Sequence, residues 1–137
     1  GDSSPQIDFI TIATTGDALD FVGTLRFGTV ASEGCSNATR GVMKMRGGSY
    51  VNDIDYITIA TLGNSVEFGD ATNNVGGCAA MSSSTRAVFA GGYGSPAFRN
   101  DIFKVEIATT GNAVDFAGDV SYNADHLAGF SNGHGGL

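Results

Sequence analysis

The sequence predicts an all-β protein built from a unit of about 47 residues that recurs along the chain. Charged residues make up 15% of the 137 residues, below the ~25% usual in globular domains, while glycine takes 21 positions and proline two. Long stretches rich in Thr, Ser, Val, Ile and Phe favour strands, and no helix of ordinary length can be recognised. A hydrophobic segment that leads into a glycine-containing turn then appears three times.

The first half of the unit consists of two hydrophobic segments around that turn. Residues 7–17 (IDFITIATTGD) recur as 54–64 (IDYITIATLGN) and, more loosely, as 102–112 (IFKVEIATTGN), at offsets of 47 and 48. Each copy continues into a segment that ends on phenylalanine: 18–21 (ALDF), 65–68 (SVEF) and 113–116 (AVDF).

The physical interpretation of this half is a β-hairpin. Ile10 and Ile12 alternate with a threonine, as in a half-buried strand, and Gly16 can take the positive φ that a turn requires. Leu19 and Phe21 then return on the neighbouring strand. We expect antiparallel hairpins at 7–22, 54–69 and 102–117, with turns at Gly16, Gly63 and Gly111.

The second half of the unit is a polar turn between two short strands. Residues 35–42 (CSNATRGV) align with 81–88 (MSSSTRAV) at an offset of 46, and the strands that follow close on the glycine pairs 47–48 and 91–92. The third copy, 130–137 (FSNGHGGL), has the turn and stops where its second strand should begin. Four antiparallel strands per repeat of this length indicate a β-propeller blade.

The order of the signals resembles the kelch repeat: a strand that ends in Gly-Gly, a loop, an aromatic-bearing strand, a turn, and another strand with an aromatic residue. The aromatic residues that carry the resemblance are Phe9, Tyr56 and Phe103, followed by Phe21, Phe68 and Phe116. Residues 54–64, followed by 66–70 (VEFGD) and 82–86 (SSSTR), are similar to the degenerate kelch-type repeats of structural and tail-fibre proteins of marine phages. The first copy departs from the pattern, because residues 43–46 (MKMR) are inserted before its glycine pair.

This resemblance covers nearly the whole chain and implies a single propeller segment over 1–137, with repeats at 7–53, 54–101 and 102–137, or about two and a half kelch-like blades. The segment opens on an outer hairpin without its inner strands and finishes on inner strands without an outer hairpin. Such a piece leaves β edges open. We therefore expect head-to-tail self-association, or completion by another segment of a longer polypeptide.

Charge and hydropathy exclude some partners. The net charge of −7, without a Lys/Arg cluster, argues against nucleic acids and against an anionic membrane surface. No apolar run approaches the ~18 residues of a spanning helix.

The cysteines and histidines are too few for a recognisable metal or redox motif. Cys35 and Cys78 could form one disulfide in an oxidising compartment, but two buried free thiols are the prediction. His126 and His134, with Asp125, could meet at one metal, yet their spacing is not that of a zinc site. We predict no metal and no cofactor.

The repeated charged residues are predicted to be structural. Arg40 and Arg86 occupy the same turn in successive units, where they could bind a carboxylate or acidic sugar. The expectation is that they bond neighbouring carbonyls or pair with Asp and Glu of the next blade. The acidic residues recur as well, so the sequence predicts a solvent-facing row and not the paired carboxylates of a glycosidase: Asp8, Asp55, Asp20, Glu67 and Asp115.

Two further motifs carry little functional weight. The glycine pairs lack the Lys-Ser/Thr and the helix of a phosphate-binding loop. Asn37-Ala38-Thr39 is a glycosylation sequon, meaningful only in a secretory host. No copper-site Tyr/His set is present.

Three functions follow as hypotheses, none with a predicted catalytic residue. The resemblance implies a non-catalytic structural or receptor-binding component of a virion or extracellular appendage, with a virion or extracellular location. One alternative is a lectin-like propeller module that binds carbohydrate, and the other is a fragment of a propeller enzyme such as a glycosidase or oxidase.

Overall fold

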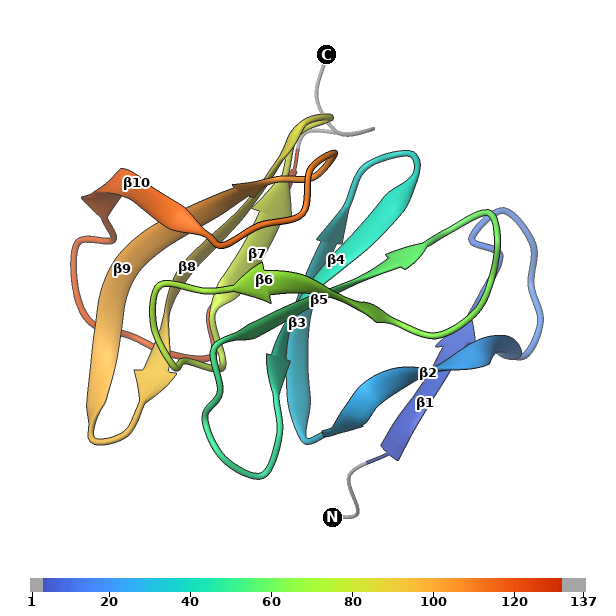
Figure 1. The fold of residues 1–137 in the computed structure, drawn as a ribbon, viewed down its shortest axis with the longest axis horizontal. Helices are drawn as coiled ribbons and strands as arrows, with labels where there is room; N and C mark the ends of the chain where they lie inside the picture. The colour runs from blue at the N-terminus through green and yellow to red at the C-terminus, as the bar shows by residue number, and fades with distance from the viewer. Residues whose placement is uncertain (1–3, 132–137) are drawn as a thin grey trace.

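A computed structural model of the chain describes residues 4–131, which form three antiparallel β-sheets and no helix (Figure 1). Sheet I contains β1 (Ser4–Phe9) and β2 (Leu19–Thr29). Sheet II contains β3 (Ala31–Ser36), β4 (Arg40–Arg46), β5 (Asp53–Thr58) and β6 (Val66–Asp70). Sheet III contains β7 (Ala79–Ser82), β8 (Arg86–Gly94), β9 (Ala97–Glu106) and β10 (Val114–Asp119).

Within each sheet the strands pair in sequence order, and sheet II lies between the other two (Figure 1). The all-β prediction is therefore confirmed. Each four-stranded sheet joins the second half of one sequence repeat to the first half of the next. No strand occurs in residues 120–131, and the rest of the inner strands expected near the C-terminus, from residue 132 onward, lies outside the described residues.

The three hairpins form as predicted. Their closing pairs are Phe9 with Leu19, Tyr56 with Val66 and Lys104 with Val114. The connections are longer than tight turns, since they cover residues 10–18, 59–65 and 107–113, and each contains the expected glycine.

The strands end earlier than the hydrophobic alternation predicted. Ile10 and Ile12 lie beyond β1 and are 64% and 94% exposed, so the expected half-buried face is wrong for the first hairpin. Ile107, at the position of Ile12 in the third copy, is fully buried, and its N–H donates to the Thr85 carbonyl of sheet III at 2.7 Å. Residues 4–131 place no strand on the other side of β1, so the first loop lacks this support.

Two strand details also differ from the prediction. The second glycine pair, 91–92, does not close β8 but lies inside it, at an irregularity in the pairing with β9. Phe103 is opposite Asp115, which makes it the counterpart of Asp55 and not of Tyr56. It stacks on Phe89 of the adjacent strand, with ring centroids 5.4 Å apart.

The main core lies between sheets II and III. Its members include Phe68 from sheet II, Phe89, Phe103 and Ile107 from sheet III, and Val75 from the connection between the sheets. Burial of each such side chain stabilises the fold by roughly 1.5–3 kcal/mol. The core therefore lies between two successive sheets and holds them together.

Within residues 4–131 no helix has the length and apolar character needed to cross a membrane.

Candidate functional site

A glycine on the outer strand of one sheet meets the hairpin loop of the next sheet, and this junction occurs twice. At the first junction, a Cβ on Gly23 would overlap the carbonyl group of Gly63 and lie 2.8 Å from the backbone N of Asn64. The side chain of Asn64 accepts a hydrogen bond from Thr24 N–H at 3.0 Å, and Ser65 N–H donates to the Thr24 carbonyl at 2.9 Å.

The second junction uses equivalent residues between sheets II and III. A Cβ on Gly69 would overlap the Gly111 carbonyl oxygen. Asn112 Oδ1 accepts the Asp70 N–H at 3.1 Å, and Ala113 N–H donates to the Asp70 carbonyl at 2.7 Å. The repeated Gly-Asn pair in the hairpin loop is therefore a contact between sheets.

The two repeated arginines contact protein groups of the predicted kinds. Arg40 donates to the Ile107 carbonyl in sheet III at 2.8 Å, and its guanidinium lies 4.5 Å from the centroid of the Tyr56 ring. Arg86 pairs with Glu106 of its own sheet at 2.9 Å. Arg40 thus adds another polar contact between sheets II and III.

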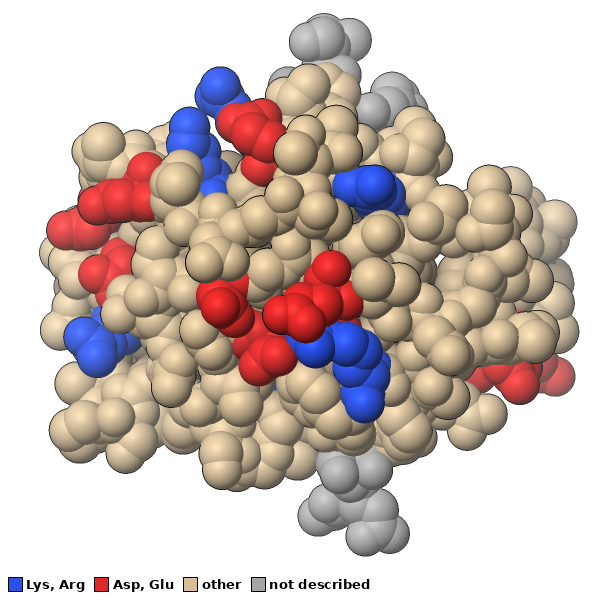
Figure 2. Space-filling model, viewed as in Figure 1, with Lys and Arg blue, Asp and Glu red and all other residues tan. Residues whose placement is uncertain are grey.

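A charge cluster that the repeat pattern did not predict links sheets I and II. The Arg26 guanidinium lies 2.7 Å from Asp55 Oδ1, 2.8 Å from Asp53 and 3.1 Å from Glu67. Burial alone would lower the pKa of Arg26, but its hydrogen bonds and opposite charges raise it. Figure 2 shows acidic and basic side chains meeting near the middle of this face, with much of the remaining surface uncharged.

Asp55 corrects the prediction of a solvent-facing acidic row. It is fully buried, and Ser65 Oγ–H donates to its second carboxylate oxygen at 2.7 Å. Burial is possible because both oxygens are hydrogen-bonded and the Arg26 charge is adjacent. The other four acids are exposed: Asp8, Asp20, Glu67 and Asp115.

Two of the exposed acids shape the backbone. Asp20 Oδ1 accepts the N–H of Val22, and Asp115 Oδ1 accepts the N–H of Ala117, both at 2.7 Å. Val22 and Ala117 have positive φ and stand at irregularities in the strand pairing. These carboxylates therefore stabilise bulges, and they are not brought together as a catalytic pair would be.

A fully buried lysine, Lys44, belongs to strand β4. Lys44 Nζ donates to the carbonyls of Met45 at 2.9 Å and Val51 at 2.6 Å. Burial lowers its pKa, while the negative charges nearby, including that of Glu33, oppose this effect. Glu33 accepts the Gly77 N–H at 2.8 Å, so it ties β3 to the segment that precedes β7.

Both cysteines are free thiols, as predicted, although Cys35 is only half-buried. Burial raises the pKa of Cys35 to about 11 and that of Cys78 to about 12, where the nearby charge of Glu33 contributes. Neither sulfur is therefore a ready nucleophile.

The histidine site is not assembled in the described part of the chain. His126 is exposed and its Nδ1 lies 2.9 Å from Asp125 Oδ2, and His134 lies outside the described residues. Among residues 4–131 no cluster of three His, Cys, Asp or Glu side chains could hold a metal ion. The Asn37 side chain caps its own turn, since Oδ1 accepts the N–H groups of Thr39 and Arg40, both at 2.9 Å.

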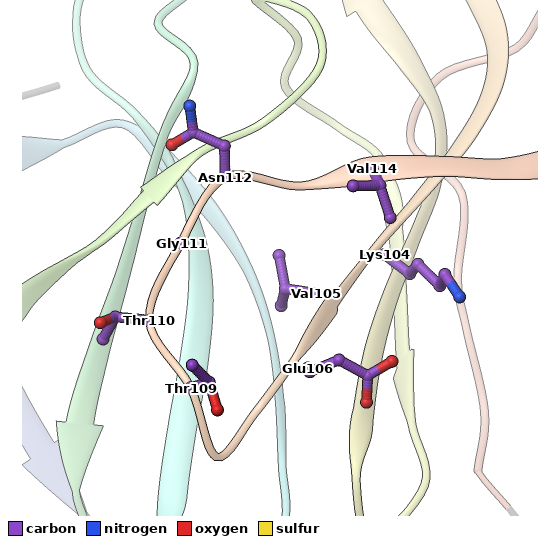
Figure 3. Close-up of a pocket in the computed structure, with 8 residues that line it drawn as sticks. All are labelled: Lys104, Val105, Glu106, Thr109, Thr110, Gly111, Asn112 and Val114. Atoms are coloured by element: carbon purple, nitrogen blue, oxygen red, sulfur yellow. The ribbon is translucent and has the colours of Figure 1, made fainter.

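The hairpin loops enclose hollows that recur with the repeat. One of about 400 Å³ lies inside the loop between β9 and β10, where Val105 points into the loop, away from Lys104 and Glu106 (Figure 3). A second of about 340 Å³ lies at the equivalent loop of sheet I and is lined by Thr11, Thr14, Thr15, Gly16, Asp17 and Leu19. Because the hollows recur at equivalent loops, we attribute them to the conformation of the loop.

A hollow of a different kind spans the connections at the opposite ends of the strands. It has a volume of about 330 Å³ and is lined by Ser49, Tyr50, Asn74 and Ser95; we call it the Tyr50 hollow. Ser49 and Tyr50 come from the β4–β5 connection, Asn74 from β6–β7 and Ser95 from β8–β9, so sheets II and III both contribute.

A row of aromatic rings adjoins this hollow. The rings of Tyr50 and Tyr93 are edge-to-face at 5.2 Å, as are those of Tyr93 and Phe98 at 5.1 Å. Arg46 lies over the Tyr50 ring at 4.5 Å and donates to its hydroxyl oxygen at 3.1 Å. We call Tyr50, Tyr93 and Phe98 the aromatic row.

The sequence interpretation missed this region, although a signal was present. Tyr50 and Tyr93 each follow a glycine pair, at 47–48 and 91–92. The two tyrosines stand at different distances from their pairs, so an alignment by repeats does not superimpose them.

Comparison of the sequence with models of known protein families and with curated proteins finds no match.

Proposed function

We propose that this protein is a non-catalytic structural or receptor-binding component of a virion or extracellular appendage, built from kelch-like propeller blades. The observation that carries the proposal is the use of the repeated polar residues. Asn64, Asn112 and Arg40 make contacts between successive sheets, and Arg26, which has no arginine counterpart in the other copies, does the same. Side chains engaged in this way favour a rigid stack of repeats over an active site.

The propeller interpretation rests on sheets II and III. Each is a four-stranded antiparallel meander, and the same junction joins it to the preceding sheet. Both features are expected of blades. Sheet I then supplies the outer hairpin of a further blade.

The same junction chemistry supports self-association or completion by a further segment of the polypeptide. Gly118 and Asp119 stand where Gly69 and Asp70 stand in sheet II, yet a Cβ on Gly118 would meet no described atom within 4 Å. Phe116 is 45% exposed, whereas its counterpart Phe68 is buried. Another hairpin, from a second copy or from a further segment of the same polypeptide, fits this place.

Purified particles from the source culture provide the test. Quantitative mass spectrometry should find peptides of this chain enriched in virions or appendages relative to the cell lysate. Light scattering of the isolated chain should show assembly, and a truncation after Asn123 should weaken it. Recovery of the chain only in the cytosolic fraction would refute the location and role.

Carbohydrate binding is the second candidate function, because the Tyr50 hollow combines aromatic and polar side chains at the ends of connecting loops. Binding residues are often carried by such loops on a rigid scaffold. A glycan array with the intact chain tests this function separately from particle location.

A further inference from the structure

The Tyr50 hollow contains polar side chains without partners in the fold. Within residues 4–131, the side chains of Ser49, Asn74 and Ser95 are exposed to solvent and make no hydrogen bond to another part of the fold, and all three line the same 330 Å³. A hydroxyl and a carboxamide each both donate and accept. Their most complementary ligand is a molecule whose own groups also donate and accept, as sugar hydroxyls do.

The aromatic row adds an apolar component beside these polar groups. Phe98 is 48% exposed, and its ring continues the series that begins with the Tyr50 and Tyr93 rings. Aromatic rings offer large, rigid contact areas at small entropic cost, while Ser and Asn offer adaptable hydrogen bonds. A pyranose ring matches this pairing because it presents C–H groups on its faces and hydroxyls on its rim.

The charge of the hollow restricts the ligand further. None of its four lining residues is ionisable near neutral pH. The adjacent cation, Arg46, is committed to the face and hydroxyl of Tyr50. An acidic sugar would lose hydration here without gaining a free cation as partner, whereas a neutral sugar would lose little.

The volume and position of the hollow fit a short chain of sugars. A space of about 330 Å³ lies at the lower end of the range of ligand sites. Because the lining comes from three connections of two sheets, a bound ligand would bridge these sheets without disturbing a strand.

We infer that the Tyr50 hollow and the aromatic row form a binding site for neutral oligosaccharides. The inference rests on the second candidate function, carbohydrate binding, and specifies its site and ligand class. Asn74 orients the sugar through its amide, the two serines contact hydroxyls, and Phe98 packs against the sugar ring.

The test is an amide NMR titration of the intact chain with uncharged disaccharides (lactose, maltose, cellobiose and chitobiose) and, in parallel, with sialyllactose and digalacturonate. At least one neutral sugar should shift the amides of residues 49, 50, 74 and 95. Asn74→Ala should weaken that binding by about tenfold, or about 1.4 kcal/mol, and Phe98→Ala by a similar factor.

Ser84→Ala is the matched control, because Ser84 is an exposed serine in the polar turn at the opposite ends of the strands. It should leave the affinity within about twofold, and all variants should keep the wild-type spectrum outside the site. Binding of acidic sugars alone, or neutral sugars that shift amides elsewhere, would overturn the inference while leaving carbohydrate binding intact. If no sugar shifts any amide at millimolar concentration, both the inferred site and the carbohydrate-binding function are overturned. Both are also overturned if an added peptide shifts these amides and no sugar does.

Discussion

Gly23→Ala is the most direct test of the junction between sheets I and II. Gly23 has no positive φ, so the substitution introduces no backbone strain of its own. The new methyl group would instead overlap the Gly63 carbonyl, which is backbone and cannot rotate away like a side chain. The hairpin loop of sheet II must withdraw from β2 to make room.

The expected cost combines steric strain with lost hydrogen bonds. Forcing one extra carbon into a packed contact typically costs about 1–3 kcal/mol. Withdrawal of the loop also weakens the bond from Thr24 N–H to Asn64 and the bond from Ser65 N–H to the Thr24 carbonyl, each worth about 1 kcal/mol. We expect the free energy of unfolding to fall by about 2–4 kcal/mol, which lowers the melting temperature by roughly 6–15 °C.

Urea unfolding followed by far-ultraviolet circular dichroism measures this loss. Gly48→Ala is the control, since Gly48 is an exposed glycine without positive φ and its Cβ would meet no described atom within 4 Å. The control should change stability by no more than about 0.5 kcal/mol. Equal stabilities of the two variants would refute the junction as a contact that holds the sheets together.

Three further outcomes follow from the buried polar groups. Asp55→Ala should destabilise the fold by about 2–4 kcal/mol in urea unfolding, because Arg26 Nε and the buried Ser65 hydroxyl lose their acceptor. Asp53→Ala removes a partly exposed acid from the same guanidinium and should cost less than about 1 kcal/mol. The lowered pKa of Lys44 means that the unfolded chain binds more protons than the folded chain, so the stability of wild type relative to Lys44→Met should rise with pH up to about 10.5 and then level off. With folded pKa values of about 11 and 12, Cys35 and Cys78 should react with iodoacetamide at pH 8 much faster in denaturant than in buffer, and equal rates would contradict their burial.

The hairpins could be predicted because their signals are local. The alternation that leads into Tyr56, the glycine of the loop and the return at Val66 are all encoded within a dozen residues, and the structure pairs these two residues directly. The Gly-Asn pairs of the loops were visible too, but sequence alone assigned them to turns. Their second role, as the surface that receives Gly23 or Gly69, depends on how sheets approach one another.

Burial could not be predicted from the repeat, because it depends on what the neighbouring sheet supplies. Residues 10–15 and 105–110 have closely similar sequences and form equivalent loops, yet Ile12 is 94% exposed and Ile107 is fully buried. The third loop is held from both sides, since the Ile107 N–H donates to Thr85 of sheet III and the Ile107 carbonyl accepts from Arg40 of sheet II, whereas residues 4–131 place no strand on the other side of β1. The Tyr50 hollow was missed for the same reason, since its residues meet only when three separate connections reach the same end of two sheets.

One strand position holds different residue types in the three hairpins. Asp8, Asp55 and Phe103 pair with equivalent acids on the next strand and therefore occupy the same place in the three hairpins. The first is exposed, the second is buried against Arg26, and the third is buried in the core against Phe89.

A buried carboxylate is tolerated at this position only where a cation and a hydroxyl satisfy it, and a phenyl ring serves where the neighbouring sheet provides an apolar surface. In the third hairpin the position of Ser65 is also held by an apolar residue, Ala113. The two residues are thus polar together in the second hairpin and apolar together in the third. The residue type that this position accepts therefore depends on what the neighbouring sheet presents to it.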